Sequence, residues 1–254
     1  MIFAAGVGSR LRPFTDSHPK ALLPVGGRAM LDRVLDNMVK AGIGDLVVNV
    51  HHFASQVVDH VANNGRNDVR VRVSDESPLL LDTGGGLLKA AGLLWPDADL
   101  AQEDVLLHNA DILTDVNLGA MCEAHKRSGA DVTLLVSARQ SSRMLYFDEC
   151  GQMRGWMNQK TGETKPEGFV PAGFTPLAFG GVHVVSPRIK PMLEKYADAV
   201  GPVFSIMPFY LDNLQDLNVR SFVVEGDYMW HDVGSPEKYS AAEAAIARRQ
   251  TLRD

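Results

Sequence analysis

A short stretch near the start of the chain combines glycines and cations in a way that suits phosphate binding. Residues 4–13 have the sequence Ala-Ala-Gly-Val-Gly-Ser-Arg-Leu-Arg-Pro, and Lys20 follows soon after. Glycine has no Cβ, so successive backbone N–H groups can turn toward one anion. Arginine grips two phosphate oxygens at once, and lysine adds a compact charge. Arg10, Arg12 and Lys20 therefore predict a triphosphate site at this loop.

The loop does not match two common nucleotide-binding motifs. The dinucleotide fingerprint needs a third glycine where Leu11 stands, and a P-loop needs a Gly-Lys-Ser/Thr sequence that does not follow. The two glycines alone fit a tight structural turn equally well. The cations favour the phosphate interpretation, because the chain as a whole is acidic, with a net charge of −6.

A carboxylate stands at the end of a predicted buried strand. Asn109-Ala110-Asp111 follows the apolar run 104–108, and ligands bind at the carboxyl ends of strands in open α/β sheets. Mg²⁺ prefers oxygen ligands, and one or two carboxylates together with substrate phosphates can hold it. Asp111 has no basic neighbour in the sequence, so it predicts a cation site, with a helix cap or turn residue as the alternative.

Three consecutive glycines, at positions 84–86, stand at the start of a predicted helix. Glycine is unfavourable there unless something approaches the backbone closely. The pattern predicts such an approach, and a flexible turn is the alternative.

The elements that must position these residues alternate as in a βαβ fold. Short β-branched or apolar runs alternate with stretches of helical periodicity through the first half of the chain. The expected strands are 1–5, 46–50, 69–73, 104–108 and 132–136, and the expected helices are 30–39, 54–61, 87–94 and 118–126. The sequence thus predicts an α/β fold with a Rossmann-like, mostly parallel sheet flanked by helices.

The second half of the chain has a different pattern. A hairpin is expected over 144–157 and a long loop over 159–176, followed by strands at 177–185 and 219–224 and helices at 203–214 and 235–249. No linker divides the chain. We therefore expect a single domain, 1–254, with a nucleotide-binding half over 1–138 and a small β-rich part within 139–254.

Composition excludes several classes of protein. The 254 residues are 45% hydrophobic, which suffices for a buried core, and there is no basic run of the kind that binds nucleic acid. Gly6 and Gly8 interrupt the first apolar run before it could form a signal peptide or a membrane span. Cys122 and Cys150 lack metal-site spacing and predict free thiols. We expect a cytoplasmic protein with no nucleic-acid or membrane partner.

Two linked motifs resemble the signature of a known enzyme family. Residues 6–15, Gly-Val-Gly-Ser-Arg-Leu-Arg-Pro-Phe-Thr, and residues 19–25, Pro-Lys-Ala-Leu-Leu-Pro-Val, look like the two-part motif of the sugar-1-phosphate nucleotidylyltransferases, or sugar-nucleotide pyrophosphorylases. The likeness covers essentially the whole chain. It is closest to short bacterial members such as the N-acetylmuramate-1-phosphate uridylyltransferases, and the mannose-1-phosphate guanylyltransferases come next. It implies a GT-A-like nucleotidyltransferase fold and a role in nucleotide-sugar biosynthesis for the cell wall.

The resemblance also implies roles for individual residues. Asp111 and Asp232, the latter in a late motif over 230–236, would be the ligands of Mg²⁺, although Asp232 could instead cap the helix that follows. The glycines at 84–86 would pack against the nucleobase, and Asn49 would line its pocket, unless it merely caps a strand end. The implied nucleotide-binding residues are Ala5, Gly6, Gly8, Ser9, Arg10, Lys20, Asn49, Gly84 and Gly85, and the implied catalytic residues are Arg10, Lys20 and Asp111.

On the sugar side the sequence departs from the family. Many members carry a Glu-Lys pair where this chain has Asn158-Gln159-Lys160, so Asn158 stands in the place of the acid. Glu163 and Lys165 on the adjoining loop are alternatives for the missing contact. The implied sugar-phosphate-binding residues are Asn109, Asn158, Lys160 and Gly181. The resemblance thus implies that 139–254 is the sugar-binding half, with a small β-rich sugar-binding part and the late metal ligand Asp232.

The resemblance implies transfer of a nucleotidyl group from a nucleoside triphosphate, UTP first and GTP second, to a sugar-1-phosphate, with release of pyrophosphate. A guanylyltransferase acting on mannose- or heptose-1-phosphate is the nearest alternative. A GT-A glycosyltransferase and a non-catalytic nucleotide-sugar sensor are others, and an oxidoreductase fits least because Leu11 breaks its fingerprint. The sequence decides neither the base, nor the sugar, nor whether the protein is a monomer or a homodimer.

Overall fold

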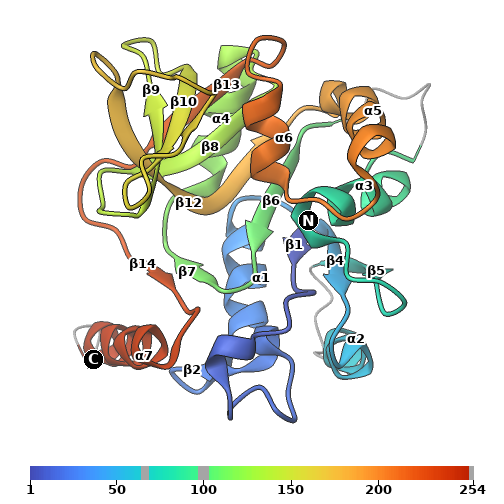
Figure 1. Cartoon of the computed structure of the whole chain (residues 1–254). Helices are drawn as coiled ribbons and strands as arrows, with labels where there is room; N and C mark the ends of the chain where they lie inside the picture. The colour runs from blue at the N-terminus through green and yellow to red at the C-terminus, as the bar shows by residue number, and fades with distance from the viewer. Residues whose placement is uncertain (64–68, 97–102, 252–254) are drawn as a thin grey trace. The chain divides into compact units, whose positions relative to one another are not determined.

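The computed structural model describes residues 1–63, 69–96 and 103–251, in which strands and helices alternate along most of the chain (Figure 1). Internal contacts group the chain into two units that interleave in the sequence. Unit 1 consists of residues 1–80, 108–119 and 227–254, and unit 2 of residues 81–107 and 120–226. Three segments far apart in the sequence, including both ends of the chain, therefore fold together in unit 1.

A parallel sheet forms the middle of unit 1. Its strands, in spatial order, are the end of β6 (Val105–Asn109), β1 (Ile2–Phe3), β4 (Asp45–Val50) and β5 (Arg70–Asp75). Of β6, only His108 and Asn109 belong to unit 1. All neighbouring strands are parallel, and the register places Phe3 opposite both Asn49 and Asn109. β1 is shorter than the expected strand 1–5 because the N–H of Ala4 donates to the side chain of Asn49 and not to a neighbouring strand. The sheet nevertheless confirms the predicted parallel α/β pattern.

Three helices belong to unit 1: α1 (Met30–Lys40), α2 (Ala54–Asn63) and α7 (Pro236–Thr251). α1 buries Met30, Leu31, Val34, Leu35 and Met38, which recur at the spacing of one helix face. The chain turns away after α1 at Gly42, whose φ of +81° lies in the left-handed region that glycine adopts readily. The sequence predicted all three helices to within a few residues.

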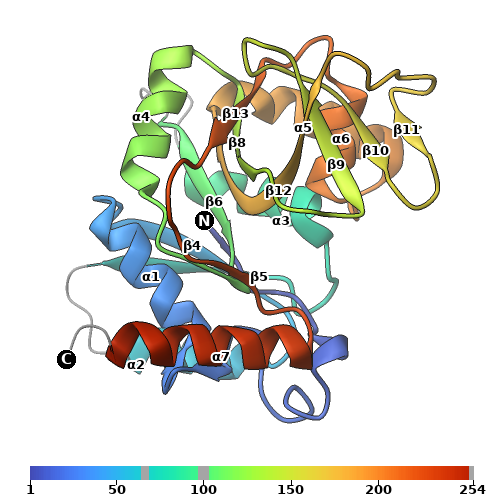
Figure 2. The same cartoon turned by 90° about the vertical axis from the view of Figure 1, so that its left-hand side faces the viewer.

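A pair of short strands was not expected from the sequence. β7 (Ile112–Thr114) and β14 (Trp230–Asp232) pair antiparallel, with Ile112 opposite Asp232. Figure 2 shows the last part of the chain leading into the long helix α7. Each strand has only three residues, which is too few to show a period of two along the sequence.

One apolar cluster holds the two ends of unit 1 together. It packs side chains from the N-terminal loops, β7 and α7 into one core. Its buried members are Leu11, Leu23, Val25, Met30, Leu113, Val233, Ala242 and Ile246. Burial of these side chains couples the folding of the first 30 residues to that of the C-terminal helix.

Unit 2 is richer in antiparallel strands. β11 (Thr164–Lys165), β10 (Met153–Asn158), β9 (Arg143–Phe147) and β12 (Thr175–Val185) follow one another in space, and β8 (Val132–Ser137) lies between β12 and β13 (Val219–Val223). Its helices are α3 (Asp82–Leu94), most of α4 (Leu118–Ser128), α5 (Lys190–Val200) and α6 (Ile206–Asp212). The predicted hairpin is confirmed as β9 and β10, joined by a turn in which Gly151 has a φ of +75°.

Helix α5 was not predicted from the sequence. Leu193 is its one fully buried hydrophobic residue, so the helix presents little apolar periodicity. Pro191 in the first turn is a helix-start signal that could have revealed it. Within the described parts of the chain, no helix is both long and apolar enough to cross a membrane.

Candidate active site

The glycine loop leaves β1 as a tight turn that favours glycine at position 8. Gly8 has a φ of +69°, and a 3-10 turn, Ser9–Leu11, begins directly after it. The carbonyl of Gly8 accepts hydrogen bonds from the N–H of Leu11 at 2.8 Å and from the hydroxyl of Thr15 at 2.9 Å. A Cβ at Gly8 would lie 2.9 Å from Cγ2 of Thr15 and 3.0 Å from Cβ of Lys20. The loop is therefore packed against the segment that carries Lys20.

The other part of the loop faces outward. Gly6, Ser9 and Arg10 are exposed, and a Cβ at Gly6 would meet no atom within 4 Å. Arg12 is also exposed, but its Nε lies 3.4 Å from Oδ1 of Asp16. Arg12 thus has a carboxylate partner on the surface, whereas the backbone of Gly6 and the side chains of Ser9 and Arg10 are accessible to a ligand.

Lys20 lies against Asp111 in the folded chain. Nζ of Lys20 is 2.5 Å from Oδ2 of Asp111, and the Lys20 side chain is only 11% exposed. Asp111 lies two residues beyond Asn109, the last residue of β6. The sequence shows no basic residue beside Asp111, but the fold supplies one from 91 positions away. Two residues assigned to one site from separate motifs are therefore in direct contact.

Asp232 ends β14 and pairs with Ile112, the residue that follows Asp111. The N–H of Val233 donates to the carbonyl of Asp111 at 2.8 Å. The carboxylate of Asp232 accepts a hydrogen bond from Nζ of Lys238 in the first turns of α7. Lys238 was not predicted as a site residue, because a surface lysine near the start of a helix is common and does not indicate a binding site. Each of the two carboxylates is thus paired with a lysine.

Arg10 approaches Asp232 across a glycine. A Cβ at Gly234 would lie 2.7 Å from Oδ1 of Asp232 and 3.2 Å from Nη2 of Arg10. A larger residue would therefore push the guanidinium and the carboxylate apart. Ser235 caps α7, since its hydroxyl accepts from the N–H of Lys238 at 3.4 Å. Asp232 thus does not serve as the cap that was its structural alternative.

Positively and negatively charged side chains lie close together in this part of unit 1. Arg10, Lys20 and Lys238 stand around Asp111 and Asp232. Among the described residues, no group of three His, Cys, Asp or Glu side chains is close enough to hold a metal ion. Two carboxylates fit a hard cation that takes its remaining ligands from water and substrate phosphates. They do not form a closed structural metal site.

Asn49 braces the start of the loop. Its Oδ1 accepts from the N–H of Ala4 at 2.7 Å, and its Nδ2 donates to Oε1 of Glu76 at 2.7 Å. The carbonyl of Glu76 also lies 2.8 Å from Nδ1 of His51. Asn49 and Glu76 are buried, so these hydrogen bonds fix the backbone just ahead of Ala5. Asn49 therefore makes the hydrogen bonds expected of a residue that caps the end of a strand. Contact of Asn49 with a nucleobase stays a prediction.

In unit 2, the backbone around Phe204 lies against the glycines of α3, where the sequence predicted that some group approaches the backbone closely. The N–H groups of Gly84 and Gly85 donate to the carbonyl of Phe204, at 2.9 and 3.2 Å. A Cβ at Gly84 would lie 2.3 Å from the Phe204 ring, and one at Gly85 would lie 2.1 Å from the carbonyl oxygen of Pro202. Nucleobase contact at these glycines stays a prediction, and it would have to use atoms other than the two N–H groups.

The predicted sugar-side residues of unit 2 lie on separate strands. Asn158 ends β10, and its Oδ1 accepts from the N–H of Lys160 at 3.0 Å in the turn that follows. Gly181, with a φ of +75°, lies in an irregular part of β12 where the register against β8 shifts. Lys165 pairs with Asp212 at 3.2 Å. Asn109 belongs to unit 1, beside Asp111, so the structure does not bring the four predicted sugar-phosphate contacts together within one unit.

Comparison with protein families and known sequences finds similar proteins. A model described as nucleotidyl transferase matches residues 1–147, which include the glycine loop, Lys20 and Asp111. An N-acetylmuramate alpha-1-phosphate uridylyltransferase from Caulobacter vibrioides is 33% identical over 97% of this chain and 96% of its own length. A mannose-1-phosphate guanyltransferase from Schizosaccharomyces pombe is 25% identical over 94% of this chain, which spans 61% of that relative.

Two solved structures share the fold. A glucose-1-phosphate thymidylyltransferase structure from Bacillus anthracis, in complex with sucrose, superposes with a TM-score of 0.79 at 15% identity, covering 96% of this chain and 93% of the other. HddC from Yersinia pseudotuberculosis, complexed with GMP-PN, gives a TM-score of 0.70 at 19% identity, covering 96% and 97%. At these identities the likeness is one of fold, and it confirms the mostly parallel sheet flanked by helices.

Proposed function

The chain belongs to the nucleotidyl transferase family, and we propose that it transfers the uridylyl group of UTP to a sugar-1-phosphate and releases pyrophosphate. The observation that carries the proposal is the contact of Lys20, next to the glycine loop, with Asp111, whose carbonyl accepts from the residue after Asp232. This arrangement offers cations for a triphosphate and carboxylates for a metal within one unit. N-acetylmuramate-1-phosphate is the first sugar substrate to test, because the Caulobacter relative carries that name over nearly its whole length.

The proposed reaction needs no covalent intermediate. An oxygen of the sugar phosphate attacks the α-phosphorus of UTP, a new P–O bond forms, and the bond to the bridging oxygen of pyrophosphate breaks. The attacking phosphate is already an anion, so no protein base has to remove a proton. Catalysis then depends on holding two anions together in line and on stabilising the charge that develops on the leaving group.

The residues of unit 1 divide this work between them. The backbone at Gly6 and Gly8 and the side chains of Ser9 and Arg10 would bind the β- and γ-phosphates. Lys20 would leave Asp111 and stabilise the negative charge on the departing pyrophosphate. Lys20 packs against Gly8 of the glycine loop, so its ammonium group would need only a short movement to reach a phosphate bound there. Arg10 lies close enough to Asp232 to link the loop to the metal ligands.

Mg²⁺ fits the proposed site. Asp111 and Asp232 would hold it, and its charge would neutralise the α-phosphate and the sugar phosphate when both are bound. Lys20 and Lys238 pair with these carboxylates in the structure, so both ammonium groups would have to move or share the carboxylate oxygens. The proposal also includes the cytoplasmic location expected from the sequence.

A matrix of four nucleoside triphosphates against several sugar-1-phosphates, followed by pyrophosphate release, tests the proposal directly. We expect the highest kcat/KM with UTP and N-acetylmuramate-1-phosphate. GTP with mannose-1-phosphate is the second combination, supported by the guanyltransferase relative. Release of a nucleoside diphosphate from a nucleotide sugar would indicate a glycosyltransferase, and tight binding without turnover would indicate a sensor.

A further inference from the structure

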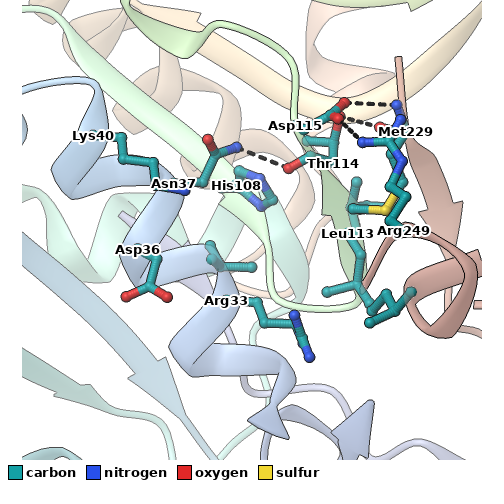
Figure 3. A pocket seen from close by; sticks show the side chains of 13 residues that line it. Arg33, Asp36, Asn37, Lys40, His108, Leu113, Thr114, Asp115, Met229 and Arg249 are labelled. Atoms are coloured by element: carbon teal, nitrogen blue, oxygen red, sulfur yellow. Dashed lines mark hydrogen bonds and ion pairs between the residues drawn. The ribbon is translucent and has the colours of Figure 1, made fainter. Parts of the chain in front are cut away.

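A cavity of about 290 Å³ lies in unit 1 outside the candidate active site (Figure 3). It is lined by side chains of α1, of the end of β6, of β7 with the residue after it, and of the C-terminal segment. No residue assigned above to nucleotide, metal or sugar phosphate lines it. Its apolar wall includes Leu113, Met229 and Ile246, and its polar wall includes Asn37, Lys40 and His108. Ligand pockets combine such an apolar wall with a few polar groups that fix orientation.

His108 lines this cavity and carries a buried acceptor. The side chain is 1% exposed, and Figure 3 shows it between side chains of α1 and those of β7. Nδ1 lies 2.8 Å from the carbonyl oxygen of Asn109, which can only accept, so Nδ1 carries the proton. Nε2 is then an acceptor, and it has no partner among the described residues. Burial lowers the pKa of His108 to about 4, so the ring is neutral near pH 7.

Positively charged side chains outnumber negatively charged ones around the cavity. Arg249 pairs with Asp115, and Arg28 pairs with Asp36, so both lining carboxylates are neutralised. Lys40 is exposed at the rim and has no ion-pair partner within the described parts of the chain. A positively charged rim attracts an anion and disfavours an ammonium group.

The orientation of Asn37 adds a second acceptor. Its Nδ2 donates to the carbonyl of Thr114 at 3.0 Å, which connects α1 to β7. Its Oδ1 is therefore available to accept, one helical turn before Lys40. Two acceptors and one ammonium group require a ligand that carries hydroxyl donors together with a negative charge.

We propose that this cavity binds a small hydroxylated anion, either a sugar phosphate or a hydroxycarboxylate. A ligand hydroxyl donates to Nε2 of His108, a second hydroxyl reaches Oδ1 of Asn37, and Lys40 binds the anionic group. The apolar wall at Leu113 and Ile246 packs against the carbon skeleton. The inference does not depend on the proposed reaction, since none of these residues belongs to the candidate active site.

Nitrogen-15 NMR of the imidazole rings in the full chain tests the proposal, with isothermal titration alongside. The probes are glucose 6-phosphate, citrate and, as a non-hydroxylated comparison, inorganic phosphate. We expect glucose 6-phosphate or citrate to move the Nε2 resonance of His108 at millimolar concentration and to bind more tightly than inorganic phosphate. Response to glucose 6-phosphate alone identifies the sugar phosphate, and response to citrate alone identifies the hydroxycarboxylate.

Two variants locate the binding. Lys40→Glu, on the surface, should raise the Kd roughly tenfold, the effect of losing one charge-assisted hydrogen bond. Lys195→Glu makes the same charge change on α5, also at an exposed position, and should leave the Kd within about twofold of the original. If His108→Phe folds, isothermal titration should show that it no longer prefers the hydroxylated probes over inorganic phosphate, and Lys40→Glu remains decisive if it does not fold.

Three results would overturn the proposal. The first is an unmoved His108 resonance with every probe, which would leave Nε2 to an ordinary buried water. The second is equal affinity for inorganic phosphate and the hydroxylated probes. The third is an equal loss of affinity in Lys40→Glu and Lys195→Glu, since a general change of net charge would then explain the binding.

Discussion

Nζ of Lys20 lies 2.5 Å from Oδ2 of Asp111, although the two residues come from different motifs of the sequence. The contact places a lysine that packs against the glycine loop next to a proposed metal ligand. The same motif occurs at Asp232, which pairs with Lys238. In the structure, both carboxylates therefore have positive partners. Substrate and metal must exchange with these lysines, and the proposed mechanism depends on that exchange.

Asp232→Asn should lower kcat on the order of 10²-fold while leaving the fold intact, because it removes one charged oxygen ligand from a preorganised site. Pyrophosphate release with Mg²⁺ measures the effect, and the Tm checks the fold. Glu237→Gln is the matched control, since it removes a nearby exposed carboxylate at the start of α7 and should change kcat little. Turnover close to wild type in Asp232→Asn would falsify the metal assignment.

Lys20→Ala should weaken triphosphate binding and lower kcat/KM on the order of 10²-fold, because the ammonium group would act on the leaving pyrophosphate. The Tm should change little, since Asp111 is still partly exposed and can be solvated. Titration of a non-hydrolysable UTP analogue gives the binding, with Lys195→Ala as the control. A large loss of Tm together with normal triphosphate affinity would show that Lys20 is structural.

Gly8→Ala and Gly6→Ala should separate folding from binding. Alanine at Gly8 must adopt a φ of +69° and meet Thr15 and Lys20, so we expect a loss of at least about 1–2 kcal/mol in unfolding free energy. Alanine at Gly6 meets no atom, so the Tm should hold while triphosphate affinity falls. Chemical denaturation and UTP titration measure the two effects. Unchanged affinity in Gly6→Ala would remove Gly6 from the phosphate site.

Gly85→Ala and Gly92→Ala test the packing of α3 in unit 2. A Cβ at Gly85 would lie 2.1 Å from the carbonyl oxygen of Pro202, so the variant should be strongly destabilised. Gly92 stands in the same helix, where a Cβ would meet nothing within 4 Å. Alanine there should raise the stability by about 0.5–1 kcal/mol. Similar Tm values for the two variants would show that the contact with Pro202 does not constrain the helix.

Removing divalent cations with EDTA should abolish pyrophosphate release, and added Mg²⁺ should restore it. The carboxylates of Asp111 and Asp232 do not make a closed cage, so Mg²⁺ should bind the free protein weakly and much more tightly once a triphosphate is present. Titrations of Mg²⁺ with and without a UTP analogue measure this difference. Full activity in the presence of EDTA would contradict the proposed cofactor.

Local chemistry explains why part of the site was predictable. The glycine loop, Lys20 and Asp111 each stand in a distinctive local sequence, and a glycine with positive φ or a carboxylate after an apolar strand has few explanations. The helix α1 and strand β4 were equally clear, because their buried residues recur with the helical or strand period.

The remaining features depend on contacts between distant segments. The pairs Lys20–Asp111 and Lys238–Asp232 exist only in the folded chain, and the short strands β7 and β14 depend on each other for their hydrogen bonds. The glycines of α3 showed that something must come close, but not that it would be Phe204 of the same chain. Sequence patterns reveal which groups need partners, whereas the fold decides which partners they get.

On the proposed assignment, the pairing of β14 with β7 also determines when the protein can become active during its synthesis. A nascent chain that ends at residue 226 already contains the loop, Lys20 and Asp111, but lacks Asp232 and the α7 residues Ala242 and Ile246 of the core around Leu11. On the proposed assignment, such a chain has half of its metal ligands and an incompletely packed loop. Turnover then begins only after the C-terminal segment has left the ribosome, so truncated products of translation would consume no UTP.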